Sequence, residues 1–355
     1  METKYIDDWK DELNICIRCA YCFAGCPVFK ELGWEADGAR GKLVIAYGLM
    51  TGELEPSQYI ADKLFQCTFC KDCLEQCSAN VAIPDVITAM RSDLFDAGYT
   101  YKEGNELLDT IKESGNIFGE ELKPPEYNEE KQVLLGCRLL ERKEDSTKYL
   151  ELLKKLGIKP KTFDETCCGM PFAVLGDKKG FAEQQDKFRD SIPDKDKDII
   201  CICTTCIFFI QKSYPDLKAK YVIDEILERL RDYTGEIKKL NRTLTYHDPC
   251  NVARGMDMVD EPREIMEMIG VELVEMPTSG KKAECCGGGG GLLASDNPLA
   301  EKMAEKRMKQ ALELGVDTLV TLCPTCEFNI GNVSQKNGGN LKVENLLDLI
   351  CEAVV

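Results

Sequence analysis

Residues Cys16–Pro27 read CIRCAYCFAGCP, and residues Cys67–Ser78 repeat the same cysteine spacing as CTFCKDCLEQCS. Each run has the pattern C-x2-C-x2-C-x3-C, in which three thiolates surround one [4Fe-4S] cubane and the fourth thiolate ligates the other cubane. The spacing therefore predicts one cluster bound by Cys16, Cys19, Cys22 and Cys77, and a second cluster bound by Cys67, Cys70, Cys73 and Cys26. Ser78 replaces the proline that usually follows the last cysteine, a difference that affects the turn and not the ligands.

Two other uses of the 20 cysteines compete with this prediction. Disulfide scaffolds are usually small secreted domains, whereas 355 residues are enough for two or three domains with their own cores. The N-terminal stretch METKYIDDWKDELN is polar and acidic and lacks the apolar run of a signal peptide, so we expect a reducing cytoplasm. Structural zinc sites favour two separated cysteine pairs over four cysteines in one run.

Charge and hydropathy exclude two classes of partner. A net charge of −17 argues against nucleic-acid binding, which requires a basic face. Apolar runs such as CIFFI are far shorter than the roughly 18 residues that span a bilayer, so membrane association would have to go through a partner.

Nucleotide-binding motifs are missing from the sequence. Neither a dinucleotide fingerprint nor a P-loop is present, so we expect flavin or nicotinamide on a partner subunit.

The N-terminal part of the chain has helical periodicity between the two cysteine runs. GARGKLVIAYGLMTGEL and PSQYIADKLFQC both place apolar residues three or four apart, which predicts helices. From Tyr101 to Lys131 the pattern weakens into a stretch rich in glycine, proline and acidic residues, which predicts a linker. We therefore expect an α-helical ferredoxin-type domain over residues 1–125.

The rest of the chain contains an internal repeat. VLLGC, TCCGMPF and the strand DIICIC followed by TTC correspond to LTYHDPC, ECCGGGGG and the strand DTLVTLC followed by PTC. Matching cysteines are 113 to 120 residues apart at five positions. Alternating strands and helices predict two pseudo-symmetric α/β lobes, over residues 126–240 and 241–355, in an α+β multidomain protein.

Each lobe carries five thiols at the matching positions of the repeat, one more than a zinc ion or an ordinary cubane uses. Adjacent cysteines such as Cys285 and Cys286 point in divergent directions, and a disulfide between them is strained, so they suit different irons of one cluster. The glycines beside them allow backbone amides to approach a cluster or a substrate, although a plain flexible turn is the simpler alternative.

The two cysteine–cysteine–glycine (CCG) motifs and the preceding dicluster domain resemble the catalytic subunit of heterodisulfide reductase, in the form that fuses its iron–sulfur carrier and catalytic parts. The resemblance runs from Cys16 to Cys326. It implies two noncubane [4Fe-4S] clusters in addition to the two cubanes, reduction of the coenzyme M–coenzyme B disulfide and a role in methanogenesis. The implied ligands of the noncubane clusters are Cys137, Cys167, Cys168, Cys203 and Cys206 in lobe one, and Cys250, Cys285, Cys286, Cys323 and Cys326 in lobe two.

The resemblance also implies site residues and partners. Cys168 and Cys286 are the expected catalytic cysteines, His247 is a candidate proton donor, and Gly169, Gly287 and Gly288 are expected to contact the cofactor. The simpler interpretation of His247 is a structural hydrogen bond beside a ligand. Arg138, Arg254, Lys281 and Lys282 flank proposed ligands and either hold an anionic substrate or are solvated surface charges. The expected partners are a small-molecule disulfide and an electron-donor subunit that carries flavin or cytochrome b.

A second interpretation has the same modular order. Iron–sulfur subunits of flavin-dependent glycolate or lactate oxidising complexes, and of anaerobic glycerol-3-phosphate dehydrogenase, are electron relays with similar motifs. The presence of both complete five-cysteine sets favours the reductase.

Overall fold

The computed structural model describes residues 2–355 as two compact units. The first unit contains the N-terminal stretch up to Leu108, together with Met170–Ala182 and Glu284–Arg307. The second unit contains Asp109–Gly169, Glu183–Ala283 and Met308–Val355. The expected borders near residues 125 and 240 stay predictions. Among the helices of the described residues, none combines the length and the apolar character that crossing a bilayer requires.

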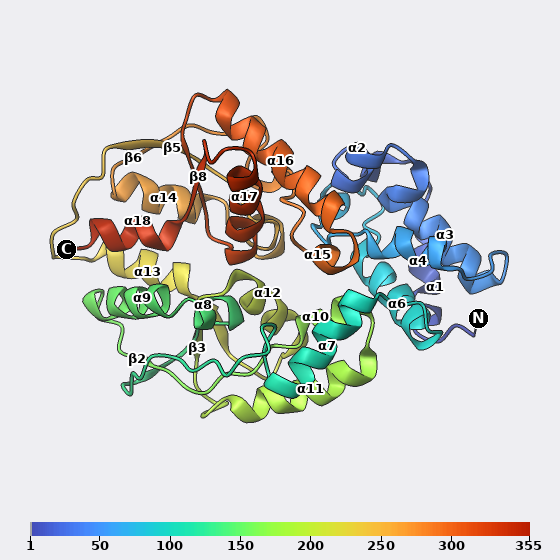
Figure 1. The fold of residues 1–355 in the computed structure, drawn as a ribbon, viewed down its shortest axis with the longest axis horizontal. Coiled ribbons are helices and arrows are strands. Elements are labelled where there is room, and N and C mark those ends of the chain that lie inside the picture. Colours follow the sequence, from blue (N-terminus) through green and yellow to red (C-terminus); the bar gives the residue numbers. More distant parts are fainter. Residues whose placement is uncertain (1) are drawn as a thin grey trace. The chain divides into compact units, whose positions relative to one another are not determined.

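The first unit is helical, as the periodicity between the cysteine runs predicts. Its N-terminal elements are short, apart from α3 and the two helices that end the stretch, α6 and α7 (Figure 1). The α-helices are α1 (Lys10–Ile15), α2 (Pro27–Leu32), α3 (Ala39–Thr51), α4 (Gln58–Phe65), α5 (Asp72–Glu75), α6 (Ile83–Asp96) and α7 (Lys102–Ser114), with single 3-10 turns at Asp7–Trp9, Tyr21–Phe23 and Glu35–Asp37. The division between the two units falls within α7, after Leu108.

The predicted linker is partly wrong, because its first part is α7. Leu108 and Ile111 lie three residues apart and are each 1% exposed, so this stretch buries one helical face despite its polar composition. The polar residues around them occupy the other side of the helix. Within the predicted linker, the stretch from Gly115 to Glu130 contains neither a helix nor a named strand.

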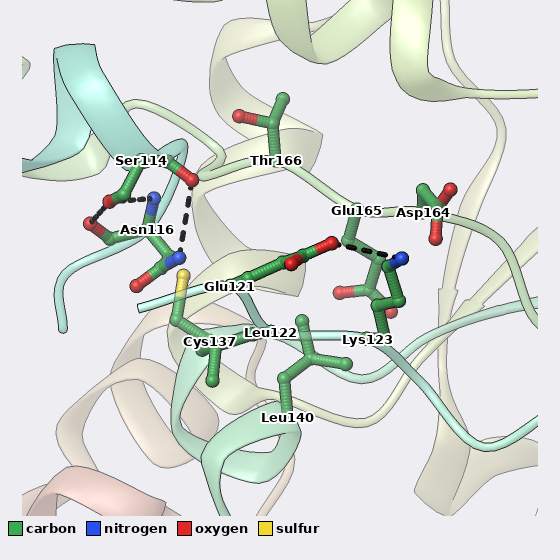
Figure 2. Close-up of a pocket in the computed structure, with 10 residues that line it drawn as sticks. All are labelled: Ser114, Asn116, Glu121, Leu122, Lys123, Cys137, Leu140, Asp164, Glu165 and Thr166. Carbon is green, nitrogen blue, oxygen red and sulfur yellow. Dashed lines mark hydrogen bonds and ion pairs between the residues drawn. The ribbon is translucent and has the colours of Figure 1, made fainter. Parts of the chain in front are cut away.

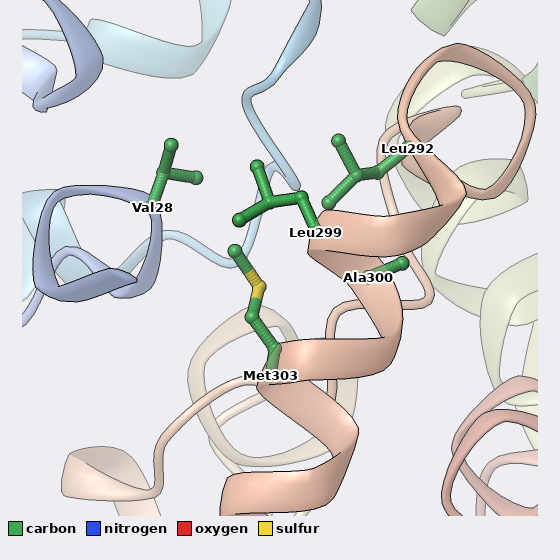
Figure 3. Close-up of a cluster of buried hydrophobic side chains, with 5 residues drawn as sticks. All are labelled: Val28, Leu292, Leu299, Ala300 and Met303. Carbon is green, nitrogen blue, oxygen red and sulfur yellow. The ribbon is translucent and has the colours of Figure 1, made fainter. Parts of the chain in front are cut away.

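Residues 284–307 pack on the N-terminal helices within the first unit. Val28 of α2 contacts a buried apolar group from α15 (Leu292–Ser295) and α16 (Asn297–Glu313), which Figure 3 shows; the group is Leu292, Leu299, Ala300 and Met303. Lys30 pairs with Glu284 at 2.7 Å, immediately before Cys285. The segment that begins with the second CCG motif is therefore anchored to the predicted ferredoxin-type domain.

The second unit contains two four-stranded sheets with matching topology. The orders are β2-β1-β3-β4 and β6-β5-β7-β8, and every pairing between these strands is parallel. The strands are β1 (Lys131–Leu134), β2 (Pro160–Lys161), β3 (Ile199–Cys201), β4 (Ala219–Tyr221), β5 (Arg242–Tyr246), β6 (Val271–Leu273), β7 (Thr318–Thr321) and β8 (Lys342–Asn345). The internal repeat in the sequence is thus a repeat of one βαβ architecture.

Helices connect the parallel strands, as such crossovers require. Besides α15 and α16, the helices after β1 are α8 (Cys137–Glu141), α9 (Lys143–Lys155), α10 (Met170–Leu175), α11 (Lys178–Ser191), α12 (Thr204–Ser213), α13 (Val222–Arg231), α14 (Asp260–Met268), α17 (Pro324–Lys336) and α18 (Leu346–Ala353), with a π-helical turn at Asn251–Gly255 and a 3-10 turn at Gly280–Lys282. Of these, α10 belongs to the first unit and α18 follows the last strand. Helices α9 and α18 lie side by side between the two sheets (Figure 1). Lys148 and Tyr149 of α9 bind the Asp348 carboxylate of α18 at 2.8 and 3.1 Å, which joins the lobes.

Candidate iron–sulfur centres

The two N-terminal cysteine runs form two separate groups of four thiols. Cys16, Cys19, Cys22 and Cys77 line one small cavity. Cys26, Cys67, Cys70 and Cys73 line another. In each cavity, three cysteines come from one run and the fourth from the other run. This is the arrangement that cross-ligation requires, and ligation itself stays a prediction.

The chemistry of these thiols fits a metal cluster. Burial raises the pKa of Cys22 and of Cys26 to about 11, and it also raises the pKa of Cys67. Thiols with pKa values raised in this way, such as those of Cys22 and Cys26, keep their protons at neutral pH unless a metal ion replaces the protons. The backbone N–H of Phe69 points to the Cys67 sulfur at 3.5 Å, and that of Val81 to the Cys77 sulfur at 3.4 Å. Such N–H groups are the partners that cluster sulfurs prefer.

The same backbone strain recurs in both runs. Arg18 and Ala20 flank Cys19 with φ of 57° and 71°, and Phe69 and Lys71 flank Cys70 with φ of 54° and 66°. None of these four residues is glycine, and left-handed backbone at such residues costs about 1 kcal/mol or more at each position. The strain directs successive thiols toward one point, and ligand bonds at that point would offset its cost.

Sequence reasoning missed two buried cations near the second group. Lys42 is 1% exposed and Arg91 is 0% exposed. Burial lowers the pKa of Arg91 to about 10, against the opposing charge of Cys67, so the guanidinium is protonated at neutral pH. Helical periodicity places Arg91 on the buried face of α6. A charged residue on an otherwise apolar helix face is the sequence feature that could have predicted this buried side chain.

The lobe-one cysteines gather where the strand order reverses. The chain leaves β1 toward β2 on one side, and β3 lies on the other side, so the carboxyl ends of β1 and β3 form a topological switch point. Cys137 follows β1 and Cys203 follows β3, so both lie at this edge. Cys203 caps α12, and Cys206 lies in the first turn of that helix, where the helix dipole favours negative charge.

The five lobe-one thiols are linked by a chain of neighbouring contacts, from Cys137 through Cys167, Cys168 and Cys206 to Cys203. Hydrogen bonds of Cys167 with Cys137 and with Cys168, together with burial, raise the Cys167 pKa well above that of an ordinary thiol. Hydrogen bonds of Cys206 with Cys168 and Cys203, together with burial, likewise raise the Cys206 pKa well above that of an ordinary thiol. The hydrogen bond from Cys206 instead lowers the pKa of Cys203, helped by the backbone amides at the start of α12 and opposed by burial. The structure therefore brings together the complete first set.

Glycine is required between β1 and Cys137. Gly136 has φ of 84°, and a Cβ there would lie 2.7 Å from Cys203 Cβ and 3.3 Å from Cys206 Sγ. The bare backbone allows β1 to approach the β3–α12 turn this closely.

A cavity of about 210 Å³ opens beside Cys137 (Figure 2). The sulfur of Cys137 points into it, and the walls come from the irregular stretch after α7 and from the loop before Cys167. Glu165 in this wall accepts hydrogen bonds from the backbone amides of Leu135 and Gly136 at 2.6 and 2.8 Å. Burial raises the Glu165 pKa to about 8, although these two hydrogen bonds lower it. Sequence reasoning missed this residue, because nothing local marks it.

The lobe-two cysteines are divided between the two compact units. Cys285 and Cys286 belong to the first unit, and Cys250, Cys323 and Cys326 to the second, so their common cluster stays a prediction. Within the second unit, Cys250 follows β5 and Cys323 follows β7, which are the same topological positions as those of Cys137 and Cys203. Cys323 caps α17 as Cys203 caps α12.

The predicted cofactor-binding glycines direct amides to cysteine sulfurs. Gly169 points its N–H to Cys167 at 3.5 Å, Gly287 points to Cys285 at 3.4 Å, and Gly288 points to Cys286 at 3.4 Å. Gly287 also needs its lack of a side chain, because a Cβ would lie 2.5 Å from the Ala300 carbonyl oxygen. Their contact with a cofactor stays a prediction.

His247, the candidate proton donor, is buried at 1% exposure. Its backbone N–H donates to the Val320 carbonyl at 2.8 Å, and its own carbonyl accepts from the Thr321 hydroxyl at 3.1 Å. These bonds fix the residue between β5 and β7, and its role in proton transfer stays a prediction.

The two predicted ligand turns meet at the lobe interface. The hydroxyl of Thr204, which follows Cys203, donates to the carbonyl of Leu322, which precedes Cys323, at 2.7 Å. Thr204 is fully buried and also contacts the Tyr221 hydroxyl at 3.0 Å. The turn that begins α12 is therefore held against the turn that begins α17.

Arg138 lies beside these turns. Its guanidinium stacks on the ring of Phe328 at 4.5 Å. Burial lowers the Arg138 pKa, and the nearby thiols of Cys323, Cys203 and Cys137 oppose that change. One positive charge is thus placed close to predicted ligands of both lobes.

Comparisons with known proteins agree with this architecture. Residues 12–81 match the family model of a 4Fe-4S dicluster domain, and residues 132–211 and 244–331 each match the model of a cysteine-rich domain, the CCG domain. A protein of Methanosarcina barkeri, one of the subunits of its dihydromethanophenazine:CoB–CoM heterodisulfide reductase, is 26% identical over 97% of this chain and 94% of its own length. The chain resembles this heterodisulfide reductase component. The predicted resemblance, the fold class and the iron–sulfur character of the chain are confirmed.

Other relatives extend the comparison. A protein of Methanothermobacter marburgensis, one of the subunits of its fumarate reductase (CoM/CoB), is 28% identical over 97% of this chain and 73% of that protein. Among solved structures, a hypothetical protein from Helicobacter pylori has the same fold with a TM-score of 0.56, at 12% identity, over 89% of this chain and 68% of that one. The chain is thus similar along its length to components of oxidoreductase complexes.

Proposed function

We propose that this chain is the catalytic subunit of an iron–sulfur disulfide reductase that acts on the coenzyme M–coenzyme B disulfide or a related anionic disulfide. The observation that carries the proposal is the buried hydrogen bond from Thr204 to Leu322, beside Cys203 and Cys323. A disulfide that splits into two thiols needs two places to receive two sulfurs, and the neighbouring ligand turns of two lobes supply them. An electron relay needs no such duplicated site.

The cofactors of the proposal are two cubanes and two noncubane [4Fe-4S] clusters. When bound, they would supply single electrons and iron atoms that accept sulfur. Cys16, Cys19, Cys22 and Cys77 would hold one cubane, and Cys26, Cys67, Cys70 and Cys73 the other. The five thiols of lobe one would hold the first noncubane cluster, and Cys250, Cys285, Cys286, Cys323 and Cys326 the second. We propose that a partner subunit with flavin or cytochrome b delivers the electrons, in the cytoplasm or at a membrane through that partner.

The chain's own residues provide binding and orientation. Arg138 offers a guanidinium beside predicted ligands of both lobes, and a guanidinium can hold a sulfonate, phosphate or carboxylate through two parallel hydrogen bonds. The Phe328 ring, 43% exposed, gives the aliphatic part of a substrate an apolar surface. His247 is the proposed proton source for a departing thiolate, a task that suits an imidazole.

The decisive experiment measures disulfide turnover by the iron-loaded chain alone. The protein is reduced by a low-potential dye under anaerobic conditions, coenzyme M–coenzyme B disulfide is added, and dye oxidation and thiol release are followed. We expect turnover by the wild type and its loss in Cys168→Ala and Cys286→Ala, while the EPR signals of the cubanes persist. Cys351→Ser is the matched control, because Cys351 is a half-buried cysteine of α18 outside every predicted set.

The opposite result would indicate that the chain is an electron relay. If the wild type does not turn over the disulfide and passes electrons to the dye only when a flavin-dependent hydroxy-acid or glycerol-3-phosphate oxidase is added, the chain is an electron-transfer component of such a complex.

A further inference from the structure

Arg91 of α6 is a buried cation without a carboxylate partner. Its guanidinium makes six hydrogen bonds of 2.6 to 3.1 Å to five backbone carbonyls, and within residues 2–355 it has no ion pair. The rings of Phe65 and Phe69 lie 4.9 and 4.5 Å from it. Carbonyl oxygens satisfy its N–H groups, but they do not neutralise its charge.

The five carbonyls belong to three segments that are distant in the sequence. Leu64, Phe65 and Cys67 lie at the end of α4 and the start of the second cysteine run. Val174 lies in α10, shortly after the first CCG motif, and Gly290 lies in the glycine run after the second CCG motif. One side chain therefore connects a predicted cubane loop with the segments that follow both CCG motifs.

The glycine run approaches the cubane loop backbone to backbone. Gly290 has φ of 66°, and a Cβ there would lie 2.2 Å from the Cys67 carbonyl oxygen. A Cβ on Gly289 would lie 2.8 Å from the Thr68 carbonyl oxygen. The flexible-turn interpretation of the glycines is therefore insufficient at these two positions, since the contact itself excludes side chains.

The charges around the two groups of four thiols differ. Lys42, the second buried basic residue, is close to Cys67 and Cys26, and its Nζ donates to the Asp37 carbonyl; burial lowers its pKa, and the nearby Cys67, Cys26 and Asp37 oppose that change. The cavity of Cys16, Cys19, Cys22 and Cys77 is lined by Arg40, which pairs with Glu35 at 2.5 Å, and Cys19 is exposed. At the Cys67 group, Arg91 therefore supplies buried positive charge without a carboxylate partner, whereas Lys42 lies near the buried Asp37 carboxylate, which pairs with Lys63 at 2.6 Å.

We propose that Arg91 is a positioning residue that fixes the Cys67 loop against the glycine run and raises the reduction potential of the cluster held by Cys26, Cys67, Cys70 and Cys73. This inference rests on the cluster assignment in the proposed function and not on the disulfide chemistry. When an external donor gives one electron to that cluster, the donor is oxidised and the cluster becomes one charge more negative. A fixed positive charge in a dry environment stabilises that reduced form.

The test separates charge from hydrogen bonding. Arg91→Gln removes the charge and keeps some donors, whereas Arg91→Lys keeps the charge and loses most donors. The iron-loaded full chain is titrated with redox dyes and followed by EPR, without any disulfide. We expect a more negative potential for one cubane in Arg91→Gln, an almost unchanged potential in Arg91→Lys, and a lower melting temperature in both.

Two further variants keep the test decisive. Lys42→Met removes the other buried basic side chain, which makes fewer hydrogen bonds than Arg91. We expect it to make the reduction potential of the same cubane more negative as well. Arg40→Met is the matched control, which should leave that cubane unchanged. Equal shifts in Arg91→Gln and Arg91→Lys, or no shift in Arg91→Gln and Lys42→Met, would overturn the inference. Because the titration contains no disulfide, the inference can fail while disulfide turnover stands, and the reverse is also possible.

Discussion

At the scale of single residues, the chain places thiols by local backbone strain and then surrounds them differently. Left-handed residues flank Cys19 and Cys70 in the same pattern, so both runs curl in the same way. The surroundings then differ, because Cys19 is exposed whereas Cys70 is buried. Exposure and nearby charge are among the factors that set cluster potentials, so one motif used twice gives two unlike sites.

A substitution at Cys26 tests the crossed ligand sets. Cys26 lies in the first run but lines the cavity of Cys67, Cys70 and Cys73. We expect Cys26→Ser to weaken or remove that cluster and to leave the cluster of Cys16, Cys19 and Cys22 intact. EPR of the separately reduced cubanes measures this, and loss confined to the Cys16 cluster would contradict the assignment.

A substitution at Arg138 tests the anion site at the lobe interface. We expect Arg138→Met to raise the KM for an anionic disulfide about tenfold, equivalent to about 1.4 kcal/mol, because a charge-assisted contact is lost. The iron content should not change. Arg231→Met is the control, since Arg231 pairs with Glu264 at 2.6 Å on the surface, and it should not affect the KM. An unchanged KM in Arg138→Met would remove Arg138 from the substrate site.

At the scale of elements, the decisive feature is a strand-to-helix turn that is used in each lobe at equivalent positions. The order β2-β1-β3-β4 puts the ends of β1 and β3 together, and the order β6-β5-β7-β8 does the same for β5 and β7. Each third strand leads into a helix whose cap is a cysteine. The parallel sheet thus brings together cysteines that are 66 residues apart in lobe one, Cys137 and Cys203.

A pair of glycine substitutions measures how tightly this turn is packed. Gly157 has φ of 76° with nothing within 4 Å of an added Cβ, so Gly157→Ala should cost only about 1 kcal/mol of backbone strain. Gly136→Ala adds a clash with Cys203, and overpacking of this kind costs about 1–3 kcal/mol more. The melting temperature and the iron content should both be lower in Gly136→Ala than in Gly157→Ala. Equal melting temperatures and iron contents in the two variants would show that the turn at Gly136 can accommodate a Cβ.

At the scale of the whole molecule, the cofactor content is the property that distinguishes the possible functions. The match to a dicluster domain supports the two proposed cubanes, and the two cysteine-rich domains contain the two predicted five-thiol sets. Four clusters would give the chain the means to accept electrons singly and to deliver two of them to one disulfide.

Iron analysis tests this content directly. Protein that is reconstituted and desalted under anaerobic conditions should contain about sixteen irons, four in each of four clusters. About eight irons would remove the noncubane clusters from the proposal. Stoichiometric zinc with little iron would indicate a structural scaffold instead.

The sequence by itself determined the iron–sulfur character of the protein and the duplication of its α/β lobe. Cysteine spacing is a local property, so the two runs predict their cluster type, and cysteines in register 113 to 120 residues apart predict duplicated lobes. The strands before Cys203 and Cys323 and the amphipathic helices are predicted equally well, because each depends on a pattern within one short segment. The predicted linker failed over α7, because the polar composition of that stretch outweighed two buried apolar positions in the prediction.

The tertiary structure alone decided which of these local features meet. Arg91 binds carbonyls up to 199 residues away, and Gly290 reaches Cys67 through backbone contact. Glu165 is held by amides about 30 residues earlier in the chain. Thr204 joins the two lobes over 118 residues. Backbone carbonyls and amides are present at almost every residue and carry no sequence signature, so only the folded arrangement selects which of them a buried side chain binds.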